Sequence, residues 1–187
     1  MTITINIPNL LTLLRIVLIP LVVVVFYAPV PHAGPVSAVI FAVAGITDWF
    51  DGYLARRLEQ TSRFGAFLDP VADKLMVAVV LVMVVDAHHN LLLVLSAMVI
   101  IGREITISAL REWMAEIGER ARVAVSYLGK VKTTVQMFAL FFLLWREPLL
   151  GLNAQAIGEV LLVIAAALTL WSMVNYLRAA FSSASPA

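Results

Sequence analysis

The sequence predicts an all-α, polytopic membrane protein, and two observations support this. Hydrophobic residues make up 62% of the 187 residues and charged residues only 13%, against about 45–50% and about 25% in soluble domains. The apolar residues are also grouped into blocks, each long enough to cross about 30 Å of hydrocarbon. The net charge of +1 gives no indication of nucleic-acid binding. We therefore expect a single membrane-embedded domain over residues 1–187.

The first half of the chain contains three apolar blocks, which predict transmembrane helices at 10–28, 35–57 and 65–86. The segment NIPN before the first block indicates the start of an N-terminal amphipathic helix that lies at the membrane interface. Breaks follow at the proline- and glycine-rich segment YAPVPHAGP and at the polar stretch Arg57–Arg63. Such residues favour turns over helix, so the blocks are separate helices.

The second half adds three further blocks, which predict transmembrane helices at 91–112, 123–145 and 155–178. The segment DAHHN precedes the fourth helix, the charged run Arg111–Arg122 follows it, and REPLLGLN separates the last two helices. The sequence therefore predicts six transmembrane helices in all.

Basic residues predict the orientation of these helices. Of the 13 Lys and Arg residues, all except Arg146 fall at one end of the predicted bundle. Because Lys and Arg accumulate in cytoplasmic loops, we expect both termini and the loop between the second and third helices to face the cytosol.

Four aspartates lie within the second and third predicted helices: Asp48, Asp51, Asp69 and Asp73. A carboxylate at the centre of a transmembrane helix costs about 2.5–3.5 kcal/mol, so four cost about 10 kcal/mol without compensation. Carboxylate oxygens are the ligands that Mg²⁺ and Mn²⁺ prefer, and four carboxylates neutralise two divalent ions. We therefore expect a site for two Mg²⁺ or Mn²⁺ ions.

The spacing of the aspartates predicts that they converge. Asp48 and Asp51 share one face of the second helix with Gly52, Ala55 and Arg56, and Asp69 and Asp73 lie one turn apart on the third helix. Counted from the polar loop at about 1.5 Å per residue, Asp51 and Asp69 are about 9 Å deep, and Asp48 and Asp73 about 14 Å deep. Two antiparallel helices would therefore bring the acids into facing pairs.

Another class of protein also uses intramembrane acids. Isolated aspartates often serve proton relays or ion pathways in transporters, and small residues often serve helix packing. Four acids at matched depth, with Gly, Ala and Arg between them, favour the metal site. A cation transporter remains the alternative, and it predicts ion flux without any dependence on a nucleotide.

Eight positions over 26 residues match the signature of the CDP-alcohol phosphatidyltransferase family without departure: Asp48-x2-Asp51-Gly52-x2-Ala55-Arg56-x8-Gly65-x3-Asp69-x3-Asp73. Other segments resemble the bacterial branch of this family that makes phosphatidylglycerophosphate: NIPNLLTLLRIVLIP, TDWFDGYLARR, FGAFLDPVADKL, REITISALREWMAEIG and GKVKTTVQM. Together these segments cover most of the chain.

The resemblance implies metal-dependent transfer of a phosphatidyl group from CDP-diacylglycerol to an alcohol, with release of CMP. It implies that all four aspartates are metal ligands and that Asp73 is also the general base for the incoming hydroxyl. The residues implied to bind CDP-diacylglycerol are Asp48, Gly52, Ala55 and Arg56, with Thr61 or Ser62 from the loop. The resemblance further implies a homodimer in the bacterial inner membrane.

Four basic residues enter the later helices instead of staying in the loops: Arg103, Arg111, Lys130 and Lys132. Arg binds phosphate through two parallel hydrogen bonds, and Lys adds a point charge. A pocket of this kind suits a dianionic phosphate, so glycerol 3-phosphate is the predicted acceptor.

Two alternatives stay open for these basic residues. They are also explained as juxtamembrane anchors, or as ion-pair partners of Glu104 and Glu112. Inositol phosphate and phosphatidylglycerol also carry phosphate groups, so the sequence is compatible with either as the acceptor.

Overall fold

The computed structural model describes residues 7–57, 63–118 and 127–181, and these are almost wholly helical. Six helices follow one another along the chain: α1 (Ile7–Tyr27), α2 (Ala33–Arg57), α3 (Arg63–His88), α4 (Leu91–Glu116), α5 (Tyr127–Trp145) and α6 (Ala154–Phe181). Within the described ranges, β-pairing is limited to one isolated bridge between Leu149 and Leu152. The predicted all-α class is confirmed, and the predicted blocks match the helices to within a few residues.

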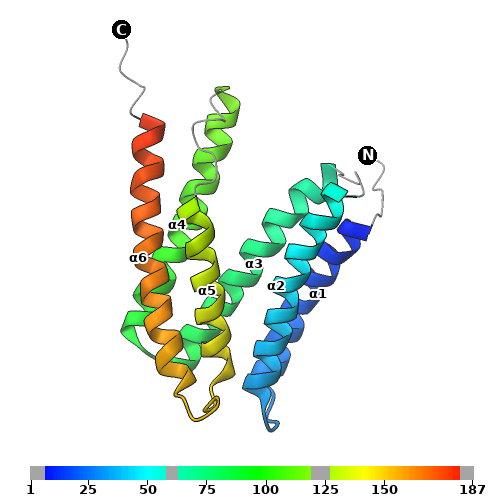
Figure 1. The fold of residues 1–187 in the computed structure, drawn as a ribbon, viewed down its shortest axis with the longest axis vertical. Coiled ribbons are helices and arrows are strands. Elements are labelled where there is room, and N and C mark those ends of the chain that lie inside the picture. The colour runs from blue at the N-terminus through cyan, green and yellow to red at the C-terminus, as the bar shows by residue number, and fades with distance from the viewer. Residues whose placement is uncertain (1–6, 58–62, 119–126, 182–187) are drawn as a thin grey trace.

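The helices form two groups that meet along the middle of the molecule. In Figure 1, α1, α2 and α3 lie on one side, α4, α5 and α6 on the other, and both termini are at the same end. Helix α1 packs against both α2 and α3, and α6 packs against both α4 and α5. Contacts of α2 with α5 and of α3 with α4 and α5 join the groups. Helices α1 and α5 are therefore both neighbours of the two helices that carry the aspartates, and α1 packs more extensively on them.

Within the described part of the chain, three helices contain segments long and apolar enough to cross a membrane: Asn9–Tyr27 in α1, Leu91–Glu116 in α4 and Ala154–Arg178 in α6. Helices α2 and α5 have shorter apolar segments, and α3 carries four charged residues between Asp69 and Asp86. All six helices contain between 19 and 28 residues, or about 28–42 Å at 1.5 Å per residue. The chain is a polytopic membrane protein, and six spans stay a prediction.

The N-terminal interfacial helix also stays a prediction. Residues 7–9 form the first turn of α1, which continues without interruption to Tyr27. The residues before Ile7 lie outside the described part of the chain.

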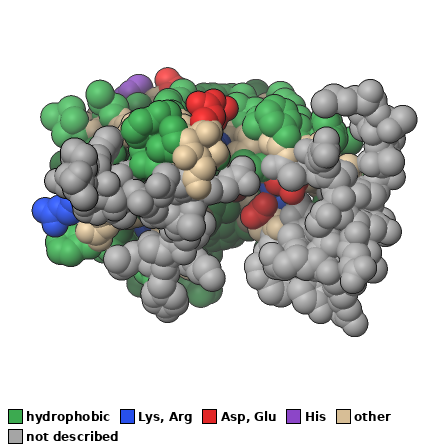
Figure 2. All heavy atoms as spheres, turned by 90° about the horizontal axis from the view of Figure 1, so that it is seen from above, with side chains coloured by type: hydrophobic (Ala, Val, Ile, Leu, Met, Phe, Trp, Pro, Cys, Tyr) green, Lys and Arg blue, Asp and Glu red, His purple; other side chains and the backbone are tan. Residues whose placement is uncertain are grey.

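Apolar side chains occupy both the inside and the outside of the bundle. A large buried cluster joins α1 to the other helices, with Val22, Phe41, Leu81 and Leu140 at most 1% exposed. Many large apolar side chains face outward, as a lipid environment favours. Seen from the end that carries the termini, hydrophobic side chains form most of the described surface, with a few acidic groups between them (Figure 2).

Candidate active site

Two polar side chains of α1 contact the aspartates of α2 and α3. Arg15 Nη1 lies 2.7 Å from Asp48 Oδ1, and Thr12 Oγ1 donates a hydrogen bond to Asp69 Oδ1. Thr12 and Arg15 are three residues apart, so they share one face of α1. We call Thr12, Arg15, Asp48, Asp69 and Asp73 the acidic site. Helix α1 therefore ties together two halves of the motif that lie on different helices.

This role of α1 was not predicted from the sequence, where Arg15 bears only on the orientation of the helices and no role is assigned to Thr12. The structure buries Arg15 almost completely, at 1% exposure. An arginine inside an otherwise apolar helix is costly unless an acid compensates it, and this signal pointed to a partner among the four aspartates.

Asp73 differs from Asp48 and Asp69, the other two aspartates of the motif whose side chains are described. Its side chain is exposed, and its carboxylate has no hydrogen bond or ion pair with any described residue. It nevertheless lies within electrostatic range of the charges of Asp48, Arg15, Lys74 and Glu104. Asp73 is therefore the aspartate whose oxygens are available to a ligand.

The predicted two-metal site is only partly described. Among the described residues, Asp, Glu and His side chains form no group of three that is close enough to hold a metal ion. The side chain of Asp51 lies outside the described part, so convergence of all four carboxylates stays a prediction. The same holds for the predicted residues that bind CDP-diacylglycerol: only the helical backbone is described for Gly52, Ala55 and Arg56, and Thr61 and Ser62 lie wholly outside the described part.

The predicted basic residues of α4 and α5 meet at one carboxylate. Glu104 Oε1 accepts hydrogen bonds from Arg103 Nη1 at 2.9 Å and from Lys132 Nζ at 2.6 Å. Arg103 is 6% exposed and Lys132 3% exposed. Glu104 therefore has the partner role that the sequence analysis gave as an alternative, whereas Glu112 is exposed.

Helix α6 contributes two further partners to this group. Arg103 Nη2 donates to Ser172 Oγ at 3.2 Å, and Arg111 Nη2 donates to Tyr176 Oη at 3.4 Å. The Nε atoms of Arg103 and Arg111 are buried without a hydrogen-bond partner among the described residues. We call Arg103, Glu104, Arg111, Lys132, Ser172 and Tyr176 the basic cluster. The side chain of Lys130, also predicted here, lies outside the described part.

The charges of the basic cluster do not balance. Arg103 and Lys132 both pair with Glu104, whereas Arg111 contacts Tyr176, so the cluster as defined holds three cations, one carboxylate and a net charge of +2. Buried charges are costly unless they are paired. Buried N–H donors together with excess positive charge are what an anion-binding site provides.

The basic cluster and the acidic site are neighbours across α3 and α4. Lys74, the residue after Asp73, donates a hydrogen bond to Ser108 Oγ. Ser108 Oγ in turn donates to the backbone oxygen of Glu104 at 2.7 Å. A bound anion and the free carboxylate of Asp73 would therefore lie in the same part of the molecule.

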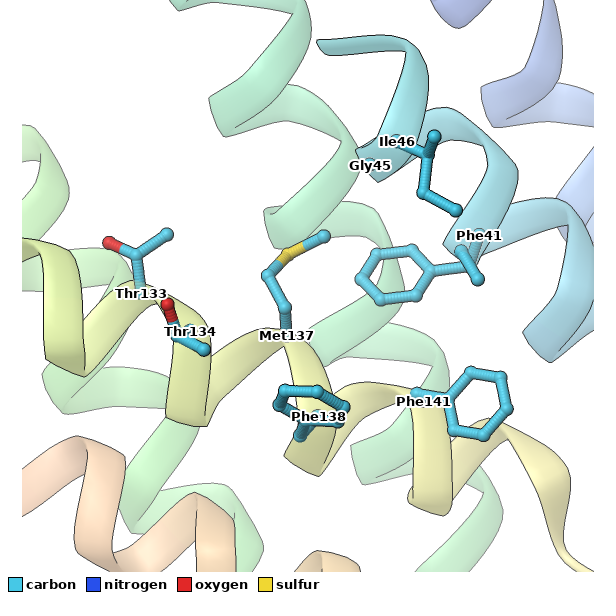
Figure 3. A pocket seen from close by; sticks show the side chains of 9 residues that line it. Phe41, Gly45, Ile46, Thr133, Thr134, Met137, Phe138 and Phe141 are labelled. Carbon is cyan, nitrogen blue, oxygen red and sulfur yellow. The ribbon is translucent and has the colours of Figure 1, made fainter. Parts of the chain in front are cut away.

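An apolar pocket lies beside the acidic site. It has a volume of about 550 Å³ between α2 and α5. Figure 3 shows Phe41, Gly45 and Ile46 of α2 facing Met137 and Phe138 of α5 across it. Gly45 lies one turn before Asp48 on α2, so the end of the pocket that Gly45 lines is close to the acidic site.

Known proteins resemble this chain over almost its whole length. It is 59% identical to a CDP-diacylglycerol–glycerol-3-phosphate 3-phosphatidyltransferase of Salmonella typhimurium, and the match covers 94% of each chain. Enzymes of the same name from Pectobacterium atrosepticum and Shigella flexneri are 60% and 57% identical over the same share. The family model for CDP-alcohol phosphatidyltransferases matches residues 5–171 of the chain. The resemblance found in the aspartate motif is thereby confirmed, and the chain belongs to the CDP-alcohol phosphatidyltransferase family.

Proposed function

We propose that this protein transfers the phosphatidyl group of CDP-diacylglycerol to glycerol 3-phosphate, giving phosphatidylglycerophosphate and CMP. One observation supports the choice of acceptor: a basic cluster whose described residues carry a net charge of +2 lies next to Asp73. A phosphate dianion supplies the two missing negative charges. The names of the bacterial relatives support the same acceptor.

Asp48, Asp51, Asp69 and Asp73 are the residues that would hold divalent metal ions. Their carboxylate oxygens fit Mg²⁺ or Mn²⁺, and four carboxylates balance two such ions. When bound, these ions would neutralise charge on the pyrophosphate of the donor and on the departing CMP.

The residues of the chain perform binding, alignment and proton transfer. The acceptor hydroxyl oxygen forms a bond to the phosphorus that carries diacylglycerol, and the bond from this phosphorus to the CMP oxygen breaks. The hydroxyl proton goes to Asp73, whose carboxylate has no partner among the described residues. Arg103, Arg111 and Lys132, together with Lys130, hold the acceptor's phosphate and thereby align its hydroxyl.

The apolar pocket between α2 and α5 would take an acyl chain of CDP-diacylglycerol. Its lining is hydrophobic apart from Thr133 and Thr134, and Gly45 places it one turn from Asp48. A lipid whose headgroup lies at the aspartates therefore has an apolar path for its tail. Gly52, Ala55 and Arg56, with Thr61 or Ser62, would contact the cytidine diphosphate.

The distribution of the basic residues supports one orientation of the protein in its membrane. We propose that it lies in the bacterial inner membrane with both termini and the acidic site facing the cytosol, where CDP-diacylglycerol and glycerol 3-phosphate meet. The assembly we propose is a homodimer.

An acceptor panel tests the proposal. Purified protein in detergent is supplied with CDP-diacylglycerol and Mg²⁺ or Mn²⁺, and CMP release is measured with glycerol 3-phosphate, inositol phosphate, phosphatidylglycerol and serine. We expect release with glycerol 3-phosphate only, and none with EDTA. Release with inositol phosphate or phosphatidylglycerol alone would assign the other acceptor.

A thermal-shift measurement separates the enzyme from the transporter. CDP or CMP with Mg²⁺ should raise the unfolding temperature of the enzyme, because a ligand that binds the folded state stabilises it. Cation flux in proteoliposomes without any response to the nucleotide would support the transporter instead.

A further inference from the structure

Helix α6 carries no residue that the sequence analysis placed in the site, yet two of its side chains contact the arginines of the basic cluster. Ser172 and Tyr176 lie four residues apart, so they face the same side of α6. They are 2% and 6% exposed. Helix α6 packs along α4, which carries both arginines (Figure 1).

The ring of Tyr176 contacts both guanidinium groups. Arg103 Cζ lies 5.5 Å and Arg111 Cζ 5.6 Å from the ring centroid, both within the range of about 6 Å for cation–π attraction. The two arginines are eight residues apart on α4. One aromatic ring therefore couples the positions of two cations that begin two turns apart.

The ring is itself held in place by apolar packing. Tyr176 forms a small buried cluster with Ile107, Leu110 and Met114 of α4. Ile107 lies midway between the two arginines along the chain, so the ring packs on the stretch of helix that separates them. A ring fixed in this way loses little additional entropy when it orients a neighbour.

The hydrogen bonds to α6 also determine which N–H donors remain. Ser172 occupies one Nη of Arg103, and Tyr176 Oη occupies one Nη of Arg111. Glu104 takes the other Nη of Arg103. The Nε atoms of both arginines stay without partners among the described residues. Both guanidiniums thus keep donors for a ligand while being fixed from the α6 side.

We propose that Tyr176 is a positioning residue for the acceptor's phosphate group: its ring and hydroxyl hold Arg103 and Arg111 so that both guanidiniums direct their remaining donors at one phosphate. This inference rests on the proposed function and deepens it. Tyr176 acts through the arginines and sets the affinity for a phosphorylated acceptor from a helix outside the aspartate motif.

The test compares Tyr176→Leu with Tyr176→Phe in steady-state assays with each substrate varied in turn. Loss of both ring contacts in Tyr176→Leu should raise the KM for glycerol 3-phosphate about tenfold. Tyr176→Phe keeps the ring and should raise it about threefold through the lost hydrogen bond. The KM for CDP-diacylglycerol and kcat should stay within about twofold in both, because neither ring contact involves the donor.

Trp171→Leu, at a position 66% exposed on the same helix, is the matched control and should leave all three values unchanged.

A double-mutant cycle keeps the test decisive if Tyr176→Leu does not fold. The threefold effect of Tyr176→Phe should vanish in an Arg111→Met background, because the hydroxyl then has no guanidinium to hold. An equal effect in both backgrounds, or an equal rise in both KM values, would overturn the inference. Normal turnover of glycerol 3-phosphate with unchanged KM in the Tyr176 variants would refute this inference alone. No turnover by the unsubstituted protein would refute the proposed function and this inference together.

Discussion

The acidic site and the basic cluster are built in opposite ways. In the acidic site the side chain of Asp48 is 44% exposed and that of Asp73 is exposed, while the supporting Arg15 is buried. In the basic cluster two of the charged groups themselves are buried, since Arg103 and Lys132 are at most 6% exposed. The acids are thus accessible to a ligand from water, whereas the arginines of the basic cluster are held in place by hydrogen bonds to Glu104, Ser172 and Tyr176.

This difference indicates how the two regions would select their ligands. Exposed carboxylates on two helices adjust to incoming cations and to the pyrophosphate that the cations hold. Buried guanidiniums that are fixed by Ser172, Tyr176 and Glu104 accept only an anion of suitable size and charge. The acidic site would therefore provide the chemistry common to the family, and the basic cluster would provide the choice of acceptor.

Removal of the base should have the largest effect. Asp73→Asn keeps the size of the side chain but cannot take the hydroxyl proton. General-base catalysis contributes about 10²–10⁴-fold, so we expect kcat to fall about 10³-fold. The measurement is CMP release at saturating concentrations of both substrates.

Asp86→Asn provides the matched control, because Asp86 lies on the same helix, α3, at the opposite end. Its carboxylate accepts a hydrogen bond from Tyr27 at 2.8 Å, so only a local structural contact changes. We expect its activity to stay within about twofold. Full activity in Asp73→Asn would show that the proton leaves by another route.

Loss of one cation of the basic cluster should affect one substrate selectively. Arg111→Ala removes a guanidinium from the basic cluster and leaves the acidic site intact. Hydrogen bonds to charged groups contribute about 1.5–3 kcal/mol, so the KM for glycerol 3-phosphate should rise about 10- to 100-fold. The KM for CDP-diacylglycerol should change little.

Arg178→Ala is the control for this variant, because Arg178 is exposed near the end of α6. It removes the same charge from the protein but not from the cluster, and we expect no change in either KM. Equal increases in both KM values for Arg111→Ala would contradict a dedicated acceptor site.

The two regions also differ in how far the sequence predicted them. The aspartate pattern is local, because its spacings of three and four residues define a helix face directly. The contacts that support the two regions are not local: Thr12 and Asp69 of the acidic site are 57 residues apart, and Arg103 and Ser172 of the basic cluster are 69 apart. Such pairs depend on which helices pack together, and periodicity within one helix does not contain that information.

Helix α6 illustrates the limit most clearly. The sequence predicted its position correctly, with a block at 155–178 against the observed Ala154–Phe181. Its apolar residues surround the helix on all sides, so no pattern identified the face that meets α4. Ser172 and Tyr176 could therefore not be predicted as site residues from the sequence. The aromatic residues of this helix are more typical of membrane-interface anchors.

Removal of the support from α1 should have a smaller effect than loss of an arginine from the cluster. Arg15→Met keeps the apolar length of the side chain but leaves Asp48 without its ion-pair partner. Since Asp48 is 44% exposed, water compensates part of the loss. We expect a moderate fall in the unfolding temperature and about a tenfold fall in kcat/KM for CDP-diacylglycerol, because misplaced ligand groups slow an aligned reaction.

Arg15→Lys separates charge from geometry at the same position. Lysine retains the positive charge and should recover part of the activity. Unchanged activity in Arg15→Met would mean that α1 does not organise the acids. A larger KM for glycerol 3-phosphate alone would place Arg15 with the acceptor instead.

The smallest expected effect concerns the pocket between α2 and α5. Ala42 lines this pocket, and Ala42→Leu would fill part of the space proposed for an acyl chain. The pocket is not fully enclosed, so an acyl chain can shift aside and the cost of overpacking should be smaller than in a closed core. The KM for long-chain CDP-diacylglycerol should rise about threefold, and the KM for short-chain donors should change less.

Val39→Leu, at a lipid-facing position on the same helix that is 50% exposed, should have no effect. Chain-length independence in Ala42→Leu would mean that the acyl chains lie elsewhere, and the acidic site would then bind its donor through the headgroup alone.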